Sequence, residues 1–239
     1  MKPNTNPKQN ELCSAIILAA GSSQRMGEDK ITISLFNIPV IIRTLKVFDS
    51  SDYISEHVVV CSKENIEKIR SLIVAADIKK PVTIIEGGNE RAVSSYLGVR
   101  ASSIKSDLVA IHDAARPLVS AEIVKSTVSA AIKHGAAAPA LKIYDTARLI
   151  DESGAVQSIK RDAIRLYQTP QVFSRRLYLE NYEKSKSFLT EITDDCELFY
   201  RNMTPVFLTE GSFENIKLTS PADILLAELI IKRGNIKCE

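Results

Sequence analysis

The first stretch of this chain with residue types suited to phosphate chemistry follows the apolar run at residues 14–18. Small residues and a glycine come next, and then the cations Arg25 and Lys30. A loop of exposed backbone N–H groups flanked by cations suits a polyphosphate. The stretch has neither the spacing of a P-loop nor the G-x-G-x-x-G fingerprint of dinucleotide sites, so an ordinary turn with solvated charges is the alternative.

A second stretch, residues 111–117, places Asp113 at the end of another apolar run. A carboxylate there can hold a hard cation beside a phosphate, because Mg²⁺ needs only one or two carboxylates when phosphate oxygens and water complete its shell. The alternatives are a helix N-cap or a salt bridge to Arg116. We interpret His112 as a packed histidine rather than as a catalyst.

Three further sites carry weaker signals. At residues 86–91 a glycine turn would let a flat base approach the main chain at Gly88, and Ser94 could add a hydroxyl contact. Lys217, expected at the end of a late strand, could act as a point charge on a phosphate. Arg161 is the remaining candidate cation. Each site taken alone is also compatible with a tight turn or with a solvated side chain.

The elements that must position these residues alternate along the chain. Short apolar runs predict strands at 14–18, 57–61, 82–85, 108–111 and 136–141, and apolar residues at helical spacing predict helices at 40–48, 63–75, 94–101 and 123–132. This alternation predicts an α/β fold, a parallel sheet with helices on both faces. Ligands of such sheets bind beyond the carboxyl ends of the strands, so Gly21, Gly88 and Asp113 should share one edge.

The alternation of strands and helices is interrupted at residues 144–164, where a β-hairpin with a turn at Ser153 and Gly154 is predicted. The hairpin is either an arm that packs on another subunit or a surface flap. The remaining predicted elements are helices at 175–184 and 194–200, a strand at 206–209, and a helix from Pro221 with Ile224, Leu225 and Leu229 on one face.

Composition limits the possible functions. The chain has 239 residues and a formal net charge of +2, with no dense basic run, so no nucleic-acid partner is expected. Its four cysteines match no zinc or redox spacing. Residues 1–12 are mostly polar and predict a disordered tail. No apolar run is long enough to cross a membrane, so we expect a cytoplasmic protein without a membrane partner.

Taken together, the motifs resemble the 2-C-methyl-D-erythritol 4-phosphate cytidylyltransferases of non-mevalonate isoprenoid synthesis. They run in family order from Ala15 to Glu228, at residues 19–27, 87–91, 112–117, 145–146, 169–171, 192–195 and 214–219. The resemblance implies a Rossmann-like, mostly parallel sheet of the nucleotidyltransferase type, forming a single domain at 13–235. It also implies that residues 144–164 form a protruding β-arm that locks a homodimer.

The resemblance further implies transfer of CMP from CTP to the sugar-alcohol phosphate, with Mg²⁺ as cofactor and release of pyrophosphate. Catalytic roles are implied for Arg25, Lys30, Arg161 and Lys217. Nucleotide-binding roles are implied for Ala19, Ala20, Gly21, Gly88, Asn89, Ser94, Asp113 and Ala114, with Asp113 also holding the metal. Substrate-binding roles are implied for Arg116, Thr146, Arg161, Thr169 and Thr193, and Thr146 and Arg161 would reach from the arm into the partner's site.

Two alternatives remain open at this level. A ribitol 5-phosphate cytidylyltransferase shares the scaffold, although Ala114, Ala115 and Thr146 favour the methylerythritol phosphate enzyme. A cytidine-nucleotide-binding module with impaired catalysis is the lesser alternative. It is permitted because Lys30 stands between aspartate and isoleucine, where the family usually has a Pro-Lys-Gln context.

Overall fold

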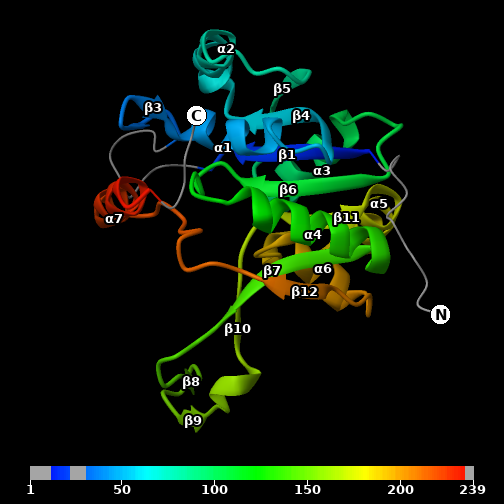
Figure 1. Ribbon diagram of the computed structural model, residues 1–239. Coiled ribbons are helices and arrows are strands. Elements are labelled where there is room, and N and C mark those ends of the chain that lie inside the picture. Colours follow the sequence, from blue (N-terminus) through cyan, green and yellow to red (C-terminus); the bar gives the residue numbers. More distant parts are fainter. Residues whose placement is uncertain (1–11, 22–30, 235–239) are drawn as a thin grey trace, which may run out of the picture.

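The computed structural model describes residues 12–21 and 31–234. An eight-stranded sheet forms its centre, with helices on both faces (Figure 1). The strands of this sheet are β1 (Cys13–Ala19), β4 (Ile54–Cys61), β5 (Val82–Glu86), β6 (Leu108–Asp113), β7 (Ala136–Lys142), β10 (Arg165–Tyr167), β11 (Gln171–Ser174) and β12 (Phe207–Glu210). The helices are α1 (Val40–Asp49), α2 (Ile66–Ala75), α3 (Arg91–Ala101), α4 (Ala121–His134), α5 (Arg175–Lys184), α6 (Asp195–Arg201) and α7 (Pro221–Lys232).

The strands follow the order β10-β7-β11-β6-β1-β4-β5, and β12 also pairs with β7, in parallel. Strand β1 lies parallel to both β4 and β6, and β4 lies parallel to β5. Only β10 and β11 run against their neighbours. The predicted mostly parallel sheet is therefore confirmed, and the carboxyl ends of β1, β5 and β6 lie at one edge.

Both faces of the sheet are buried because alternate residues of β1 point to opposite sides. Ile17 belongs to a core cluster with residues of α1, α2 and α4, and Ile16 belongs to a second cluster with residues of α3, α5 and α6. Helix α3 approaches β1 closely at Gly98, where an added Cβ would lie 2.3 Å from Cγ2 of Ile16. Only glycine allows this separation between the helix and the sheet.

Two details of the C-terminal part were predicted wrongly. Lys217 does not end a strand, because the structure has no strand between β12 and α7, and residues 211–220 form a loop. Leu225 and Leu229 do not lie on the buried face of α7; their side chains are 65% and 62% exposed, and Ala227 and Ile230 are buried instead. Helix α7 carries apolar residues on nearly all of its sides, so their spacing did not show which face is buried.

The predicted hairpin is confirmed as the antiparallel pair β8 (Arg148–Ile150) and β9 (Val156–Ser158). It projects away from the sheet beyond β7 and β10 (Figure 1). Its turn contains Gly154 in a left-handed conformation, with φ of +83°. A second, shorter hairpin, β2 (Ser34–Leu35) with β3 (Ile38–Pro39), was not predicted from the sequence.

The predicted disordered tail lies outside the described residues except for Leu12. Across 12–21 and 31–234, no helix combines the length and the apolar character that a bilayer span requires.

Candidate functional site

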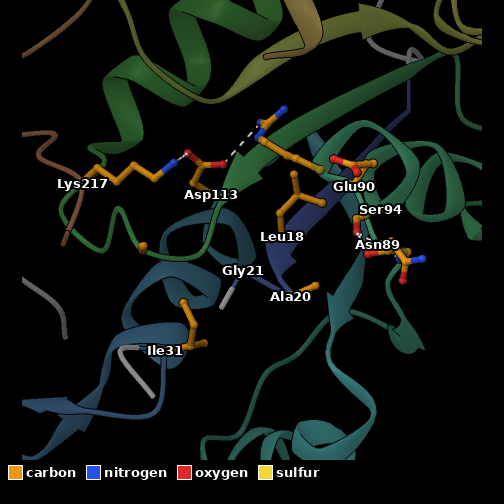
Figure 2. A pocket seen from close by; sticks show the side chains of 12 residues that line it. Leu18, Ala20, Gly21, Ile31, Asn89, Glu90, Ser94, Asp113 and Lys217 are labelled. Atoms are coloured by element: carbon orange, nitrogen blue, oxygen red, sulfur yellow. Dashed lines mark hydrogen bonds and ion pairs between the residues drawn. The ribbon is translucent and has the colours of Figure 1, made fainter. Parts of the chain in front are cut away.

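A cavity of about 340 Å³ opens at the carboxyl edge of β1, β5 and β6. It is lined by Leu18, Ala20, Gly21, Ile31, Gly88, Asn89, Glu90, Arg91, Ser94, Asp113, Ala115 and Lys217 (Figure 2). The three signals expected to share one edge of the sheet, Gly21, Gly88 and Asp113, therefore meet in one cavity.

Two small-residue turns form one wall of this cavity by packing on each other. A Cβ at Gly87 would lie 2.8 Å from the Cβ of Ala20, and one at Gly88 would lie 2.3 Å from Cγ1 of Val93. The Ser94 hydroxyl accepts a hydrogen bond from the Gly88 N–H at 3.1 Å and lies 3.2 Å from the Gly88 carbonyl oxygen, to which it can donate. The turn after β5 is thus held in one shape, with its backbone beside the cavity.

Asp113 stands on the opposite wall and is surrounded by cations. Its Oδ2 lies 2.7 Å from Nζ of Lys217 and 3.9 Å from Nε of Arg116, and its Oδ1 lies 3.3 Å from a guanidinium nitrogen of Arg91. Figure 2 shows the Lys217 and Asp113 side chains pointing toward each other. Burial alone would raise the pKa of Asp113, but the charges of Arg91 and Lys217 outweigh it and hold the pKa far below its usual value.

Arg91 also binds a second carboxylate behind the cavity. Its other guanidinium nitrogen lies 2.6 Å from Oδ2 of Asp195, whose side chain is fully buried. The Tyr178 hydroxyl donates to the other oxygen of that carboxylate at 2.9 Å, and Gln171 accepts from the Asp195 backbone N–H at 3.0 Å. Burial works to lower the pKa of Arg91, but Asp195 and Asp113 together raise it. Arg91 therefore remains charged, and its two ion pairs hold the guanidinium group in one orientation.

The buried side chain of His112 lies beneath Asp113. Nδ1 lies 3.0 Å from the Thr169 hydroxyl, and Nε2 lies 3.2 Å from the carbonyl oxygen of Arg116. The same Thr169 hydroxyl accepts from the Asp113 backbone N–H at 3.2 Å. Burial lowers the pKa of His112 to about 4, so the imidazole is neutral near pH 7.

The predicted site residues differ in where they lie relative to this cavity. Those that line the cavity are Ala20, Gly21, Gly88, Asn89, Ser94, Asp113 and Lys217. Ala19 and Ala114 are buried in the core beside it, Arg116 contacts Asp113 from one side, and Thr169 is only 4% exposed. Thr193 is exposed near the start of α6, where its hydroxyl donates to Glu197 at 3.1 Å.

The other predicted site residues lie away from this cavity or outside the described residues. Thr146 and Arg161 are exposed on the arm segment, where Arg161 donates to the Tyr144 carbonyl oxygen at 2.8 Å. Arg25 and Lys30 fall in residues 22–30, which the structure does not describe.

Sequence reasoning assigned no role to Arg91 or Asp195. Both stand inside motifs that carried the family resemblance, at residues 87–91 and 192–195. An arginine in the first turn of a helix usually indicates a solvated side chain, and 104 positions of sequence separate it from its carboxylate partner. No local pattern reveals such a pair.

The donor set of the cavity suits a metal that is held in part by its substrate. Within 12–21 and 31–234, no three His, Cys, Asp or Glu side chains are grouped so as to form a metal cage. Asp113 is the carboxylate that the sequence predicted as a ligand, and it lies at the cavity wall. A carboxylate at such a wall fits Mg²⁺, which needs only one or two carboxylates when phosphate oxygens and water complete its shell.

Comparison with known proteins agrees with this geometry. Residues 13–233 match the model of the IspD family, described as 2-C-methyl-D-erythritol 4-phosphate cytidylyltransferase. A protein of that name from Geobacillus thermodenitrificans is 39% identical over 219 residues, which cover 91% of this chain and 96% of the relative. A protein of the same name from Clostridium botulinum is 36% identical over 223 residues, covering 92% and 97% of the two chains.

Solved structures share the architecture. The 4-diphosphocytidyl-2C-methyl-D-erythritol synthase from Anaerococcus prevotii superposes with a TM-score of 0.84 at 31% identity, covering 94% of this chain and 97% of that one. The 2-C-methyl-D-erythritol 4-phosphate cytidylyltransferase from Thermus thermophilus gives a TM-score of 0.73 at 30% identity, covering 92% and 98%. On the match of nearly the whole chain, this protein belongs to the IspD family of 2-C-methyl-D-erythritol 4-phosphate cytidylyltransferases.

Proposed function

We propose that this protein transfers CMP from CTP to 2-C-methyl-D-erythritol 4-phosphate and releases pyrophosphate. The observation that carries this proposal is the convergence of Arg91, Arg116 and Lys217 on Asp113, beside a cavity walled by two small-residue turns. The family and the names of its relatives supply the nucleotide and the acceptor.

The charges of the site suit a reaction between two anions. Three cations and the carboxylates of Asp113 and Asp195 leave this group with a net charge of +1. A phosphate monoester already carries between one and two negative charges near pH 7, so it can attack the α-phosphorus without a general base. The cations lower the barrier by positioning the two anions and by stabilising the charge that develops in the transition state.

Lys217 is the cation best placed to move during the reaction. Its side chain is 39% exposed, and its loop contains no regular secondary structure. Arg91 is anchored by the buried Asp195, and Arg116 donates to the Asn215 carbonyl oxygen at 2.7 Å. Lys217 can therefore turn from Asp113 toward a phosphate while the two arginines keep their places.

We propose Mg²⁺ as the cofactor, with Asp113 as its protein ligand. Held by Asp113, Mg²⁺ would supply positive charge that offsets part of the charge of the phosphates. We propose that Arg25 and Lys30 act on the α-phosphate, and that Ala20, Gly21, Gly88 and Asn89 bind the nucleotide through the walls of the cavity. The proximity of these walls to Asp113 supports this arrangement.

We also propose a homodimer in which each arm completes the partner's site. The arm projects away from the central sheet, beyond β7 and β10 (Figure 1). Its strands leave Leu149, Ile150 and Val156 at 51%, 64% and 63% exposure, which is apolar surface suited to contact with a second copy. On this proposal, residues 13–235 form one domain, and Thr146 and Arg161 act across the dimer.

A pyrophosphate-release assay tests the function directly. With CTP and Mg²⁺, we expect turnover of 2-C-methyl-D-erythritol 4-phosphate, and slower turnover of ribitol 5-phosphate. Faster turnover of ribitol 5-phosphate would reverse the choice of acceptor, although the relatives compared above carry the methylerythritol name. Binding of CTP without turnover of either acceptor would favour the non-catalytic module instead.

A further inference from the structure

The loop at residues 211–220 carries Lys217 and contains no regular secondary structure. Two buried side-chain amides hold it, those of Gln168 and Asn215, with exposed fractions of 6% and 0%. Gln168 lies between β10 and β11, and Asn215 lies in the loop itself, 47 positions further along the chain. Neither belongs to the described residues that line the cavity, so their effect on a reaction there must pass through other side chains.

The Gln168 side chain pairs with the loop backbone much as a neighbouring strand would. Its Oε1 accepts from the Ser212 N–H at 3.1 Å, and its Nε2 donates to the Ser212 carbonyl oxygen at 2.8 Å. The orientation of the amide follows from these partners, because a backbone N–H can only donate and a carbonyl oxygen can only accept. The N–H of Gln168 donates to the Pro139 carbonyl oxygen of β7 at 2.8 Å. Gln168 therefore ties the loop to the central sheet.

Asn215 provides the second attachment. Its Nδ2 donates to the Thr169 carbonyl oxygen at 3.0 Å. Its own carbonyl oxygen accepts from the Arg116 guanidinium at 2.7 Å and lies 3.3 Å from Nε2 of Gln168. Breaking these bonds would leave buried polar groups unpaired, which is costly, so the backbone at Asn215 keeps its place.

Lys217 stands between two held points of the backbone. Asn215 is the first, and Leu218 is the second, because its side chain is 1% exposed and its N–H donates to the Ala115 carbonyl oxygen at 2.8 Å. The Lys217 ammonium group lies 2.7 Å from Oδ2 of Asp113, and the side chain is 39% exposed. A backbone held on both sides leaves the lysine the rotations of its side chain.

We infer that Gln168 and Asn215 are positioning residues for CMP transfer: their side-chain amides hold the backbone of the loop, so that Lys217 reaches both Asp113 and the phosphates by rotation of its side chain alone. This inference rests on the proposed function. A misplacement of about 1 Å at a reacting centre can cost about 100-fold in rate, so an anchor of this kind matters for turnover.

Kinetics of two variants and one control test the inference. Gln168→Met removes the amide and keeps a buried side chain of similar length, and Asn215→Ala removes the second amide. Ser212→Ala is the matched control in the same loop, because Ser212 is bonded to Gln168 through its backbone N–H and carbonyl oxygen. The double variant Gln168→Met/Lys217→Met measures whether Gln168 acts through the lysine. Urea unfolding identifies the variants that are folded under the assay conditions.

We expect Gln168→Met and Asn215→Ala each to lower kcat for pyrophosphate release by about 10–100-fold, while the KM for CTP changes by less than about threefold. Ser212→Ala should keep kcat within about threefold of the wild type. In the Lys217→Met background, Gln168→Met should cost no more than about a further threefold, because the group that it positions is already absent. Losses that multiply in the double variant, or wild-type kcat in Gln168→Met, would overturn the inference.

Hydrogen–deuterium exchange of the wild-type protein, resolved at single amides by nuclear magnetic resonance, needs neither turnover nor a stable variant. Because Ser212 and Leu218 donate their backbone N–H groups within the fold, both amides should exchange more than about 100-fold slower than in an unfolded chain. Both rates should stay within about threefold on saturation with CTP and Mg²⁺. Exchange at the unfolded-chain rate, or loss of protection when CTP binds, would mean that the loop itself moves and would contradict the inference.

The two proposals fail in different ways. Absence of pyrophosphate release by the wild type would refute the proposed function. Normal turnover by the wild type together with fast exchange at Ser212 and Leu218 would refute the positioning role alone.

Discussion

Replacing Lys217 with methionine should separate catalysis from stability. The change removes the ammonium group 2.7 Å from Oδ2 of Asp113 and keeps most of the aliphatic stem. Because the Lys217 side chain is 39% exposed and solvent screens the pair, the free energy of unfolding should fall by only about 0–1 kcal/mol. Asp113 also keeps its contacts with Arg91 and Arg116.

The effect on turnover should be much larger. The substitution takes the net charge of Arg91, Arg116, Lys217, Asp113 and Asp195 together from +1 to zero, and it removes the cation that we propose turns toward the phosphates. Loss of one group that stabilises charge in a transition state typically costs about 2.7–4 kcal/mol, or 10²–10³-fold in kcat. We therefore expect kcat for pyrophosphate release to fall by about two to three orders of magnitude.

The control is Lys133→Met, which removes an exposed lysine in the last turn of α4. Pyrophosphate release and urea unfolding should be measured on both variants and on the wild type. Lys133→Met should leave kcat unchanged. A Lys217→Met enzyme within threefold of wild-type kcat, or one that loses activity only because it unfolds, would refute the assignment of Lys217 to the reacting phosphates.

Three further predictions concern stability and assembly. Burial lowers the pKa of the His112 imidazole from 6.5 to about 4. As the pH falls, the unfolded chain therefore takes up a proton before the folded protein does. The neutral ring's contribution to the free energy of unfolding is full above about pH 6.5 and is lost toward pH 4, at about 1.4 kcal/mol per pH unit and about 3 kcal/mol in all. Urea unfolding at pH 7.5 and 4.5 should show the loss, and a folded His112→Gln variant should show a shallower pH dependence; equal slopes would contradict the buried neutral ring. Gly98→Ala should destabilise the protein by about 1–3 kcal/mol, because its Cβ would lie 2.3 Å from Cγ2 of Ile16, and an unchanged urea midpoint would show that α3 moves away freely. If Arg161 acts across a dimer, mixing Arg161→Ala and Lys217→Met subunits should restore part of the activity; purified mixed dimers without activity would contradict a shared site.

Local sequence patterns predicted the central sheet well, and also the polar groups at the carboxyl edge of its strands, for a physical reason. Apolar runs such as residues 14–18 are long enough to identify buried strands, and the residues that follow them must lie at the carboxyl edge. That rule predicts that Gly21, Gly88 and Asp113 lie together, and all three line the same cavity.

The sequence patterns failed where the spacing of apolar residues did not show which residues are buried. Helix α7 has apolar residues on nearly every side, so spacing could not show that Leu225 and Leu229 remain exposed. Lys217 lies in a loop whose position depends on tertiary contacts, including the hydrogen bond from the Leu218 N–H to the Ala115 carbonyl oxygen at 2.8 Å.

The amino-acid sequence by itself determined the family, the strand-and-helix rhythm and the positions of most chemical groups along the chain, because each depends on short stretches of residues. Only the tertiary structure decided which of those groups meet. Arg91 and Asp195 are 104 positions apart and form an ion pair at 2.6 Å, and Thr169 reaches His112 across 57 positions. Such contacts exist only when distant strands and helices pack together, because burial and hydrogen-bond direction are properties of the packed chain.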